Sequence, residues 1–495
     1  MFTLSETIKN TLEALRSGNL ELAKATFDQP TAATTGLQLW NLDAAVKTLV
    51  PRYTPLRNSI PRVGGQFAIQ ANWKAVTAID GSNTPVGVPE GTRNAAIAAT
   101  VTDYNAVFKT LSVEASASFQ AQWAGRGLED VQARARKTGA HKYIVGEELV
   151  ILGGNTTSTG IALGTPATPA STIATTGGSI SQASQYAYVV ALTLDGYKVS
   201  SLANGAGTTT SVTPADGSSA FTVKRGSSQK SAEGSALSMT GSTNKVTWTV
   251  TDIPGAVAYV WYLGSATGAA NAYIAAITTV NKYVRTTNVP TTGQKADAIT
   301  ADNSQDQYVF DGLITQIAKS TSSAYYKTLE GTTLTADNKG GITEFDELLV
   351  DRFVNYKVST YEILMSAKQT EKAGKAIRTG AAATPFTIDV SDGKNSILGG
   401  SRAIGYVHPI TGETLPFVVH PDLPDGTIIF KLVEAGPLYE DDRIPNVWQM
   451  AMRQEPFSIE WPLKTLKYEI AVVADGVLQG YFPAGNGMLS NVALS

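Results

Sequence analysis

Hydrophobic and polar residues alternate in two neighbouring stretches of the chain, 67–73 and 97–101. A segment rich in turn-forming residues, GSNTPVGVPEG at 81–91, lies between them. Alternation is typical of strands, and two such strands around a turn predict a long antiparallel hairpin. A two-stranded hairpin is marginal alone in water, so this one must lie on another surface. Nothing nearby in the sequence offers that surface, which indicates contact with another subunit.

Two other stretches show the three- to four-residue spacing of an amphipathic helix. In the first, 1–28, the charges nearly cancel, which favours an arm for protein contacts over an arm for DNA. In the second, 127–155, an apolar stripe ends at the GGN of 153–155, and glycine is a common helix stop. Gly139 interrupts this stripe, and glycine in a helix interior costs about 1 kcal/mol relative to alanine.

Residues 165–300 differ in composition from the sequence on either side. Of these 136 residues, 75 are Gly, Ala, Ser or Thr and only 13 are charged. Short strand-like runs separated by turn residues predict a β-sandwich, with candidate core residues Tyr188, Val190, Trp248, Val250, Trp261 and Leu263. The flanking segments 164–178 and 288–293 are rich in the small residues and prolines of linkers, so we interpret 165–300 as an inserted domain.

After this insert the pattern is that of an α+β protein. It predicts a helix that begins near 343–349, a strand at 361–366 followed by a helix to 375, a strand at 426–430, and paired strands at 457–462 and 468–473.

Composition excludes several classes of protein. The absence of cysteine excludes disulfide scaffolds, thiol nucleophiles and Cys-ligated metals. The net charge of −3 argues against a protein that wraps nucleic acid through a basic excess. Charged residues are only 16%, against a usual value of about 25%, which indicates that much of the surface is neutral or is buried against partners. No apolar run approaches the roughly 18 residues that a membrane span needs.

Candidate catalytic residues are few. His141, His408 and His420 stand at no metal-binding spacing, so we interpret them as structural. Glu147 and Glu148 are adjacent, and because neighbours on a helix diverge by about 100° they do not suit a paired acid and base. We expect both glutamates to be solvated. Phosphate-loop and nucleophile-elbow motifs are absent from the sequence, which therefore predicts no enzyme, no cofactor and no metal site.

Six segments follow one another in a distinctive order: 54–63 (TPLRNSIPRV), the hairpin to residue 113, the helix at 127–155, 310–313 (FDGL), 420–428 (HPDLPDGTI) and 452–462. In this order they resemble the major capsid proteins of tailed bacteriophages (Caudoviricetes), the Hong Kong ninety-seven capsid fold. The resemblance implies an α+β fold whose parts are an N-terminal arm at 1–50, an extended hairpin loop at 51–112, a peripheral domain with a long spine helix at 113–164, an axial domain at 301–435 and a return to the peripheral domain at 436–495. The inserted all-β domain at 165–300 is expected to be an immunoglobulin-like sandwich.

The resemblance also implies a function. The chain would self-assemble into hexamers and pentamers of an icosahedral shell around double-stranded DNA, in the virion, after assembly in the host cytoplasm. Its implied partners are other copies of itself, a separate scaffolding protein, a portal, decoration proteins and packaged DNA, which it would touch without sequence preference; no membrane is expected. The candidate inter-subunit contacts are Arg57, Arg62, Phe67, Ile69 and Trp73.

The same segments carry expectations about assembly. About 50 residues precede the hairpin, fewer than a fused scaffolding segment needs, so we expect a separate scaffold and no maturation cleavage. No lysine lies between Lys74 and Lys109, so the hairpin tip offers no amine for an isopeptide and a non-covalent shell is expected. We expect the insert to project from the outer surface and to be dispensable for assembly. The alternative is a surface adhesin or carbohydrate-binding protein built around the β-sandwich, which would leave the arm, hairpin and helix without a purpose.

Overall fold

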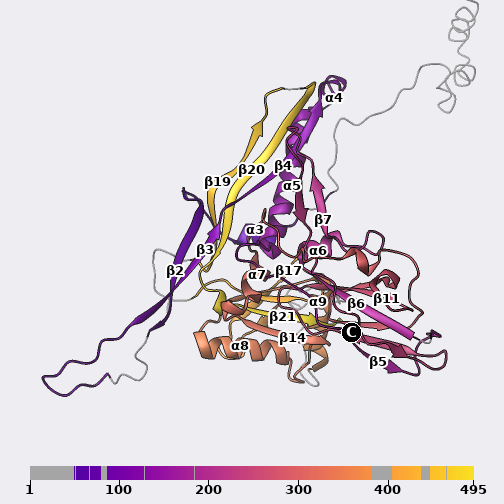
Figure 1. Ribbon diagram of the computed structural model, residues 1–495. Coiled ribbons are helices and arrows are strands. Elements are labelled where there is room, and N and C mark those ends of the chain that lie inside the picture. The colour runs from indigo at the N-terminus through magenta and orange to yellow at the C-terminus, as the bar shows by residue number, and fades with distance from the viewer. Residues whose placement is uncertain are drawn as a thin grey trace, which may run out of the picture. The chain divides into compact units, whose positions relative to one another are not determined.

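The computed structural model describes residues 50, 52–65, 67–79, 86–126, 129–182, 184–380, 404–435, 446–463 and 465–494 (Figure 1). The predicted arm helix at 1–28 lies outside these residues. The chain divides into two units, one made of Arg52–Phe119 with Gln132–Ser495 and the other of Met1–Pro51 with Gln120–Val131. Most of helix α4 (Phe119–Ala124) belongs to the second unit, and nearly all other elements belong to the first. No helix in the described ranges is long and apolar enough to cross a membrane.

The predicted hairpin is present and leads into a second sheet. β2 (Gln70–Ile79) pairs antiparallel with β3 (Ala99–Val107). The next strand, β4, pairs with β20 instead, so the hairpin ends at 107 and not at the predicted 112. The second sheet has the order β1-β19-β20-β4 and consists of β1 (Arg62–Val63), β4 (Lys109–Ser118), β19 (Trp448–Glu460) and β20 (Lys467–Gly480). β19 and β20 confirm the paired strands predicted at 457–473.

The long predicted helix is α5, Val131–Gly153, which is shorter at both ends than the predicted 127–155. It runs beside β4 and β20 (Figure 1). Gly139 faces this sheet, because a Cβ built on it would lie 3.5 Å from the Ala115 Cβ and 3.8 Å from the Val472 Cγ2. The glycine is therefore buried against the sheet, but the space beside it admits a methyl group at ordinary van der Waals distance.

The sequence after 310 forms a six-stranded mixed sheet of order β14-β21-β18-β15-β17-β16. Its strands are β14 (Tyr325–Thr332), β15 (Tyr361–Met365), β16 (Gly405–Val407), β17 (Thr414–Val419), β18 (Ile428–Leu432) and β21 (Gly487–Val492). The helices of this region are α7 (Leu313–Ala318), α8 (Thr343–Tyr356) and α9 (Ala367–Gly380), with 3-10 turns η4 (Ser320–Ser322) and η5 (Pro483–Gly485). The elements predicted at 343–375 and 426–430 are confirmed.

One strand of this sheet comes from an unexpected part of the chain. β21 pairs in parallel with β14 and antiparallel with β18, so it lies inside the six-stranded sheet. The resemblance places 436–495 in the peripheral domain, apart from this sheet. The last strand therefore crosses back and ties the C-terminal segment to 301–435.

The predicted insert, 165–300, contains two sheets that share one core, and we call it the β unit. Its sheets have the orders β13-β10-β5 and β12-β11-β6-β9, with a separate β7–β8 pair. The strands are β5 (Ala170–Ala174), β6 (Ser184–Leu192), β7 (Thr209–Val212), β8 (Phe221–Lys224), β9 (Leu237–Ser238), β10 (Lys245–Thr249), β11 (Ala258–Gly264), β12 (Tyr273–Thr278) and β13 (Lys282–Arg285). Helix α6 (Leu194–Val199) and the 3-10 turns η2 (Ala269–Asn271) and η3 (Ala296–Ala298) complete it. The immunoglobulin-like class of this unit stays a prediction.

All six predicted core residues of the β unit are buried, but they do not share one core. Trp248 and Trp261 pack between the two sheets, together with Val189 of β6. Tyr188 and Val190 lie on the opposite face of β6, in a second cluster. Because β6 is buried on both faces, its sequence lacks the polar alternation that would show which residues face the first core.

The segments predicted to be linkers are parts of the folded unit. Residues 164–178 contain β5, which pairs along its length with β10. At the other end, Val289 is buried and its backbone N–H donates to Gln182 Oε1 at 2.8 Å. The linker interpretation is therefore wrong. The first segment contains an edge strand, and the second packs against the rest of the β unit.

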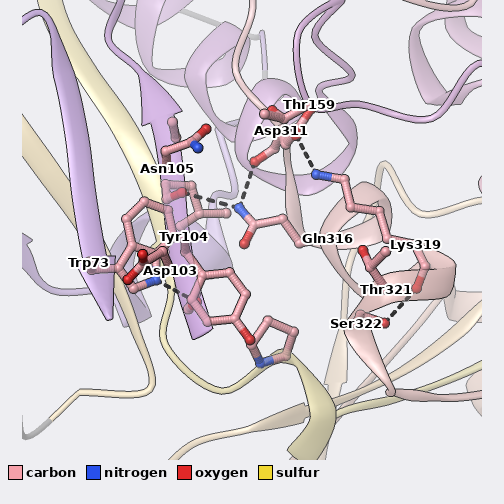
Figure 2. Close-up of a pocket in the computed structure, with 14 residues that line it drawn as sticks. Trp73, Asp103, Tyr104, Asn105, Thr159, Asp311, Gln316, Lys319, Thr321 and Ser322 are labelled. Atoms are coloured by element: carbon pink, nitrogen blue, oxygen red, sulfur yellow. Dashed lines mark hydrogen bonds and ion pairs between the residues drawn. The ribbon is translucent and has the colours of Figure 1, made fainter. Parts of the chain in front are cut away.

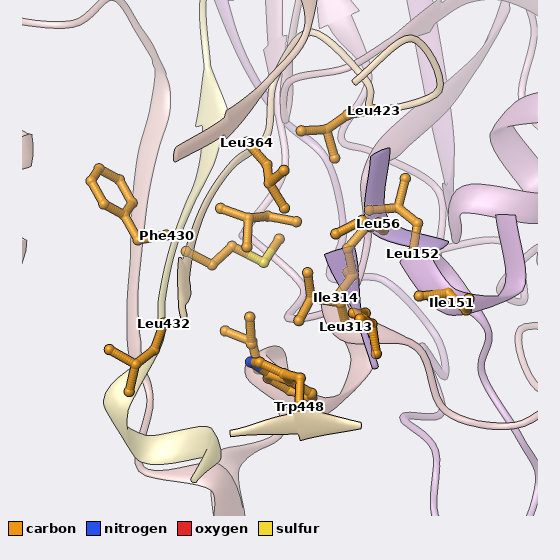
Figure 3. Packing of buried hydrophobic residues seen from close by; sticks show 14 of the residues in the cluster. Leu56, Ile151, Leu152, Leu313, Ile314, Leu364, Leu423, Phe430, Leu432 and Trp448 are labelled. Atoms are coloured by element: carbon orange, nitrogen blue, oxygen red, sulfur yellow. The ribbon is translucent and has the colours of Figure 1, made fainter. Parts of the chain in front are cut away.

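The largest core lies outside the β unit, in the part of the first unit that we call the body. It gathers side chains from α5, α7, the six-stranded sheet and β19 (Figure 3). Leu56, from the short helix before the hairpin, is fully buried in the same cluster. The start of the hairpin segment is thus packed into the centre of the subunit.

Two glycines, Gly139 within α5 and Gly154 directly after its last residue, provide a test of this packing. We expect Gly139→Ala to raise the free energy of unfolding by about 0.5–1 kcal/mol, because alanine favours the helix and its methyl group fits. A Cβ at Gly154 would lie 2.2 Å from the Phe310 carbonyl oxygen, so Gly154→Ala should lower that free energy by about 1–3 kcal/mol or more. Urea unfolding of the purified variants measures both, and destabilisation by Gly139→Ala would show that α5 lies closer to the sheet.

Candidate functional site: the junction that holds the hairpin

The chain enters the hairpin through a short helix, α3 (Pro55–Ser59). Proline at its first position suits a helix start, but no side chain caps its N-terminus from within the helix. A helix of five residues is too short to be stable alone. Its free backbone N–H groups therefore need partners from elsewhere in the fold.

Glu148 of α5 supplies those partners. Its side chain is fully buried. Its Oε1 accepts a hydrogen bond from the Leu56 backbone N–H at 2.9 Å, and its Oε2 accepts one from the Arg57 N–H at 2.7 Å. The carboxylate thus takes the place of the missing cap and lies at the positive end of α3.

His420 is the third hydrogen-bond partner of the Glu148 carboxylate. Its Nε2 lies 2.8 Å from Glu148 Oε1, and its Nδ1 accepts a hydrogen bond from the Asp422 N–H at 3.2 Å. Since Nδ1 is an acceptor, the proton is on Nε2 and is donated to the glutamate. His420 therefore connects the loop before β18 to the start of the hairpin.

Glu147, the adjacent residue, binds the same segment through charge. It forms ion pairs with Arg57 Nε at 2.6 Å and with Arg62 NH2 at 2.8 Å. The carboxylate is buried while both arginines remain partly exposed. Glu147 and Glu148 thus hold both the beginning and the end of the ten-residue segment 54–63.

The expectation that Glu147 and Glu148 are solvated is wrong. Their relative exposures are 1% and 0%. Glu147 and Glu148 do point in different directions from the helix, as neighbours should. Each glutamate therefore reaches a different part of residues 54–63. A signal was available in the sequence: these are the only charged residues in the otherwise apolar stretch 143–155.

A third charged group reaches α3 from the opposite side. Lys431 of β18 is buried, and its Nζ donates to Ser59 Oγ at 2.9 Å and to Glu362 Oε2 at 2.7 Å. Glu362 stands opposite Lys431 in the pairing of β15 with β18. The six-stranded sheet therefore holds the C-terminal end of α3 while α5 holds its N-terminal end.

The hairpin itself is anchored at one aromatic cluster. Trp73 of β2 stacks on Tyr104 of β3, with ring centroids 5.9 Å apart, and also contacts Tyr481. The indole N–H donates to the Gly480 carbonyl oxygen at 3.1 Å. Burial raises the pKa of Tyr104, as expected for a phenol packed at this base. The next cross-strand pair along the hairpin, Lys74 with Asp103, forms an ion pair at the surface.

A cavity of about 280 Å³ lies beside this anchor (Figure 2). Trp73 and Tyr104 line it from the hairpin, and Asp311, Gln316 and Lys319 line it from the body. Lys319 Nζ lies 2.6 Å from Asp311 Oδ2, so the charges facing the cavity are paired within the chain. The base of the hairpin therefore contacts the body at Trp73, which lies on one side of this partly open cavity.

The GGN and FDGL motifs meet next to this cavity. The Gly312 N–H donates to the Gly154 carbonyl oxygen at 2.8 Å, and Asp311 Oδ1 accepts from the Thr156 N–H at 2.9 Å. A Cβ at Gly312 would lie 2.6 Å from the Val150 carbonyl oxygen, so the two motifs approach as closely as backbone allows. The end of α5 is thus fixed to the start of α7.

The predicted contact residues fall into two groups. Arg57, Arg62 and Trp73 are engaged within the chain, by Glu147 or by the aromatic cluster. Phe67 and Ile69, just before β2, are 93% and 77% exposed. An inter-subunit role for all five stays a prediction, and the two exposed side chains are the ones free of such intrachain packing.

The three histidines lie in different surroundings, and their structural role stays a prediction. His408 is buried, its Nδ1 accepts from the Ile410 and Thr411 N–H groups, and burial lowers its pKa. His420 is described above, and His141 is half-buried on α5. Within the described ranges, no three His, Asp or Glu side chains are grouped so as to hold a metal ion.

The structure is similar to solved capsids of bacteriophages and of GTA particles. One is the capsid of a native GTA particle, at 9% identity and a TM-score of 0.43, covering 94% of this chain and 100% of that one. Mycobacterium phage Bobi matches at 7% identity and a TM-score of 0.42, covering 94% and 98%. The capsid of Myoviridae phage XM1 matches at 8% and 0.38, covering 92% and 97%. No family model and no curated protein matches the chain.

Removal of the buried carboxylate tests the junction. Glu148→Ala leaves two backbone N–H groups and the His420 ring without an acceptor, so we expect the free energy of unfolding to fall by about 3 kcal/mol or more. Glu148→Gln keeps one acceptor oxygen and should fall between this variant and the wild type. Chemical denaturation measures the change, with Glu455→Ala, an exposed glutamate of β19, as the control expected to change it by less than about 0.5 kcal/mol. Equal stability of Glu148→Ala and Glu455→Ala would contradict this account.

Proposed function

We propose that this chain is the major capsid protein of a tailed bacteriophage, which self-assembles into the hexamers and pentamers of an icosahedral shell around double-stranded DNA. The observation that carries the proposal is a hairpin that is fixed at its base and exposes apolar side chains beyond it. A structural subunit needs both properties: a rigid mount and a surface that another copy covers.

The hairpin exposes more apolar surface than is expected of a two-stranded hairpin surrounded by water. Val76 and Val101, in facing stretches of β2 and β3, are 60% and 49% exposed. Three more apolar side chains are exposed toward the tip: Val86, Val88 and Ile97. Covering one such side chain contributes about 1.5–3 kcal/mol, so a neighbouring subunit on this surface would gain several of these increments.

The need to fix the base of the hairpin explains why the junction around α3 is built from buried charged side chains. Apolar packing alone allows small rotations, whereas Glu147, Glu148 and Lys431 fix α3 from two sides through directed bonds. A hairpin that lies on a neighbour must leave its own subunit at a reproducible angle, or the contacts of successive subunits do not close. The single aromatic anchor at Trp73 leaves the distal strands free to adapt to the neighbour.

The parts of the subunit take the following roles in this proposal. The arm at 1–50 and the hairpin contact neighbouring copies, and the sheet of β1, β4, β19 and β20 with α5 forms the peripheral domain. The six-stranded sheet forms the axial domain and includes β21. The β unit faces outward. Arg57 and Arg62 act by holding the hairpin mount, and Phe67 and Ile69 contact the neighbour.

The partners follow from the same proposal. A separate scaffolding protein, a portal and decoration proteins accompany the shell in the virion. Contact with packaged DNA is weak and lacks sequence preference, since the net charge of −3 provides no basic excess. The activity is structural, and no enzymatic step is part of it. Nothing in the described structure favours the adhesin alternative, which gives the hairpin mount no role.

Electron microscopy of the purified chain tests the proposal. Expressed with and without a scaffolding protein, the chain should form closed shells or rings of five and six subunits in negative stain. Assembly is expected because the hairpin exposes apolar side chains that a neighbouring copy would cover. Monomers that stay dispersed at high concentration and bind glycans would overturn the proposal in favour of the adhesin.

Two side chains test the hairpin contact separately. We expect the double variant Phe67→Ser with Ile69→Ser to reduce the yield of shells at least tenfold, because it removes apolar surface that only a neighbour covers. The unfolding of the isolated subunit should be unchanged, since both side chains are exposed. Leu202→Ser, at an exposed apolar residue of the β unit, is the control and should assemble normally. Normal shells from the double variant, quantified by gradient sedimentation, would exclude these residues from the interface.

A further inference from the structure

The β unit is attached to the body by far more than its two ends. Among the described residues, three groups of these contacts lie far from the chain connections, on α5, on the strands β14 and β21, and on the loop before β18. A domain displayed on a surface needs only its chain connections. The number and position of these additional contacts point to another role.

The first place is a half-buried carboxylate in the turn after β10. Asp252 accepts a hydrogen bond from the Tyr326 hydroxyl of β14 at 2.7 Å and another from the Asn491 side-chain amide of β21. Within its own unit it accepts from the Tyr259 hydroxyl at 3.3 Å. One side chain of the β unit therefore binds two adjacent strands of the body.

Asn491 strengthens this contact from the body side. Its Oδ1 accepts from the Asn281 backbone N–H at 2.9 Å, and its amide also reaches Thr328 Oγ1 at 3.0 Å. Its backbone has φ of 54°, a conformation that costs a non-glycine residue free energy and that asparagine tolerates best. Burial raises the pKa of Asp252 while its hydrogen bonds oppose that rise, as expected for a carboxylate enclosed between two packed parts.

The second place is apolar. Leu194 and Val257 belong to the β unit by sequence, but they are buried in the core of the body. Leu194 lies against the last residue of α5, since a Cβ on Gly153 would come within 2.5 Å of its side chain. Removing the β unit would therefore open the main core at the end of α5.

The third place is the loop before β18, close to His420. Lys198 Nζ lies 2.8 Å from Asp422 Oδ1. A Cβ on Gly426 would lie 1.9 Å from the Thr279 carbonyl oxygen, so the two backbones touch at a position where only glycine fits. Three separate contacts on different elements fix the orientation of one part on another, as two chain connections cannot.

From these contacts we propose that the β unit is a brace, which holds α5, β14 with β21, and the loop before β18 in one arrangement, and that Asp252 is its latch to the six-stranded sheet. The unit and the body then unfold together, and the unit cannot be removed without loss of the body's stability. The expectation that it is dispensable is replaced by this role. The inference concerns the isolated subunit and does not rest on the proposed capsid function.

Hydrogen exchange of the full chain, read by mass spectrometry, tests the latch. In Asp252→Ala, Tyr326 and Asn491 lose a common acceptor, so amides of β14 and β21 should exchange at least tenfold faster than in the wild type. Tyr326→Phe removes one of the two bonds from the body and should give a smaller acceleration at the same strands. Asp297→Ala, an exposed carboxylate of the β unit, is the matched control and should leave exchange unchanged.

The outcomes decide the proposal in either direction. Faster exchange confined to β14, β21 and their Asp252 contacts supports the latch, as does a wild-type chain that melts in one calorimetric transition. If Asp252→Ala is too unstable to purify, Tyr326→Phe alone carries the test. Exchange at β14 and β21 that matches the Asp297→Ala control in both variants would overturn the latch. A separate calorimetric transition for the β unit in the wild type would overturn the brace.

Discussion

The subunit depends on a constraint that applies to any buried carboxylate: it must be surrounded by donors, or it costs several kcal/mol. Glu148 meets this constraint with two backbone N–H groups of α3 and the ring of His420. Because these donors come from two distant parts of the chain and the carboxylate comes from a third, satisfying one side chain brings the hairpin segment, α5 and the loop before β18 to a single point. The position of the hairpin follows from that convergence.

The rest of the structure extends outward from the end of α5. Gly154 and Gly312 allow α7 to start against that end, Leu194 of the β unit closes over it, and Lys431 reaches α3 from the six-stranded sheet. The last two turns of α5 are thus contacted by the hairpin segment, the β unit and the main core. Since Glu147 and Glu148 hold the hairpin segment here, a change at this point would alter the direction in which the hairpin leaves the body.

Periodicity in the sequence predicted the elements with local signals, which are the β2–β3 hairpin, α5, β15, β18 and the paired β19 and β20. It did not predict where β21 lies, because sheet order depends on contacts between segments about 160 residues apart. The partners of Glu148 and Glu147 were missed for the same reason, since His420 is 272 residues away and Arg57 is 90 residues away. The side chains of β6 were assigned to one core because a strand buried on both faces has no polar alternation to read.

A cryo-electron-microscopy map of the assembled particle would show directly how the hairpin leaves its own subunit and what covers it. We expect α3 to keep its place against Glu147 and Glu148 in every copy, while the strands beyond Trp73 lie on an adjacent copy and Phe67 and Ile69 are covered. A map in which the hairpin folds back on its own subunit, with those two side chains facing solvent, would contradict it.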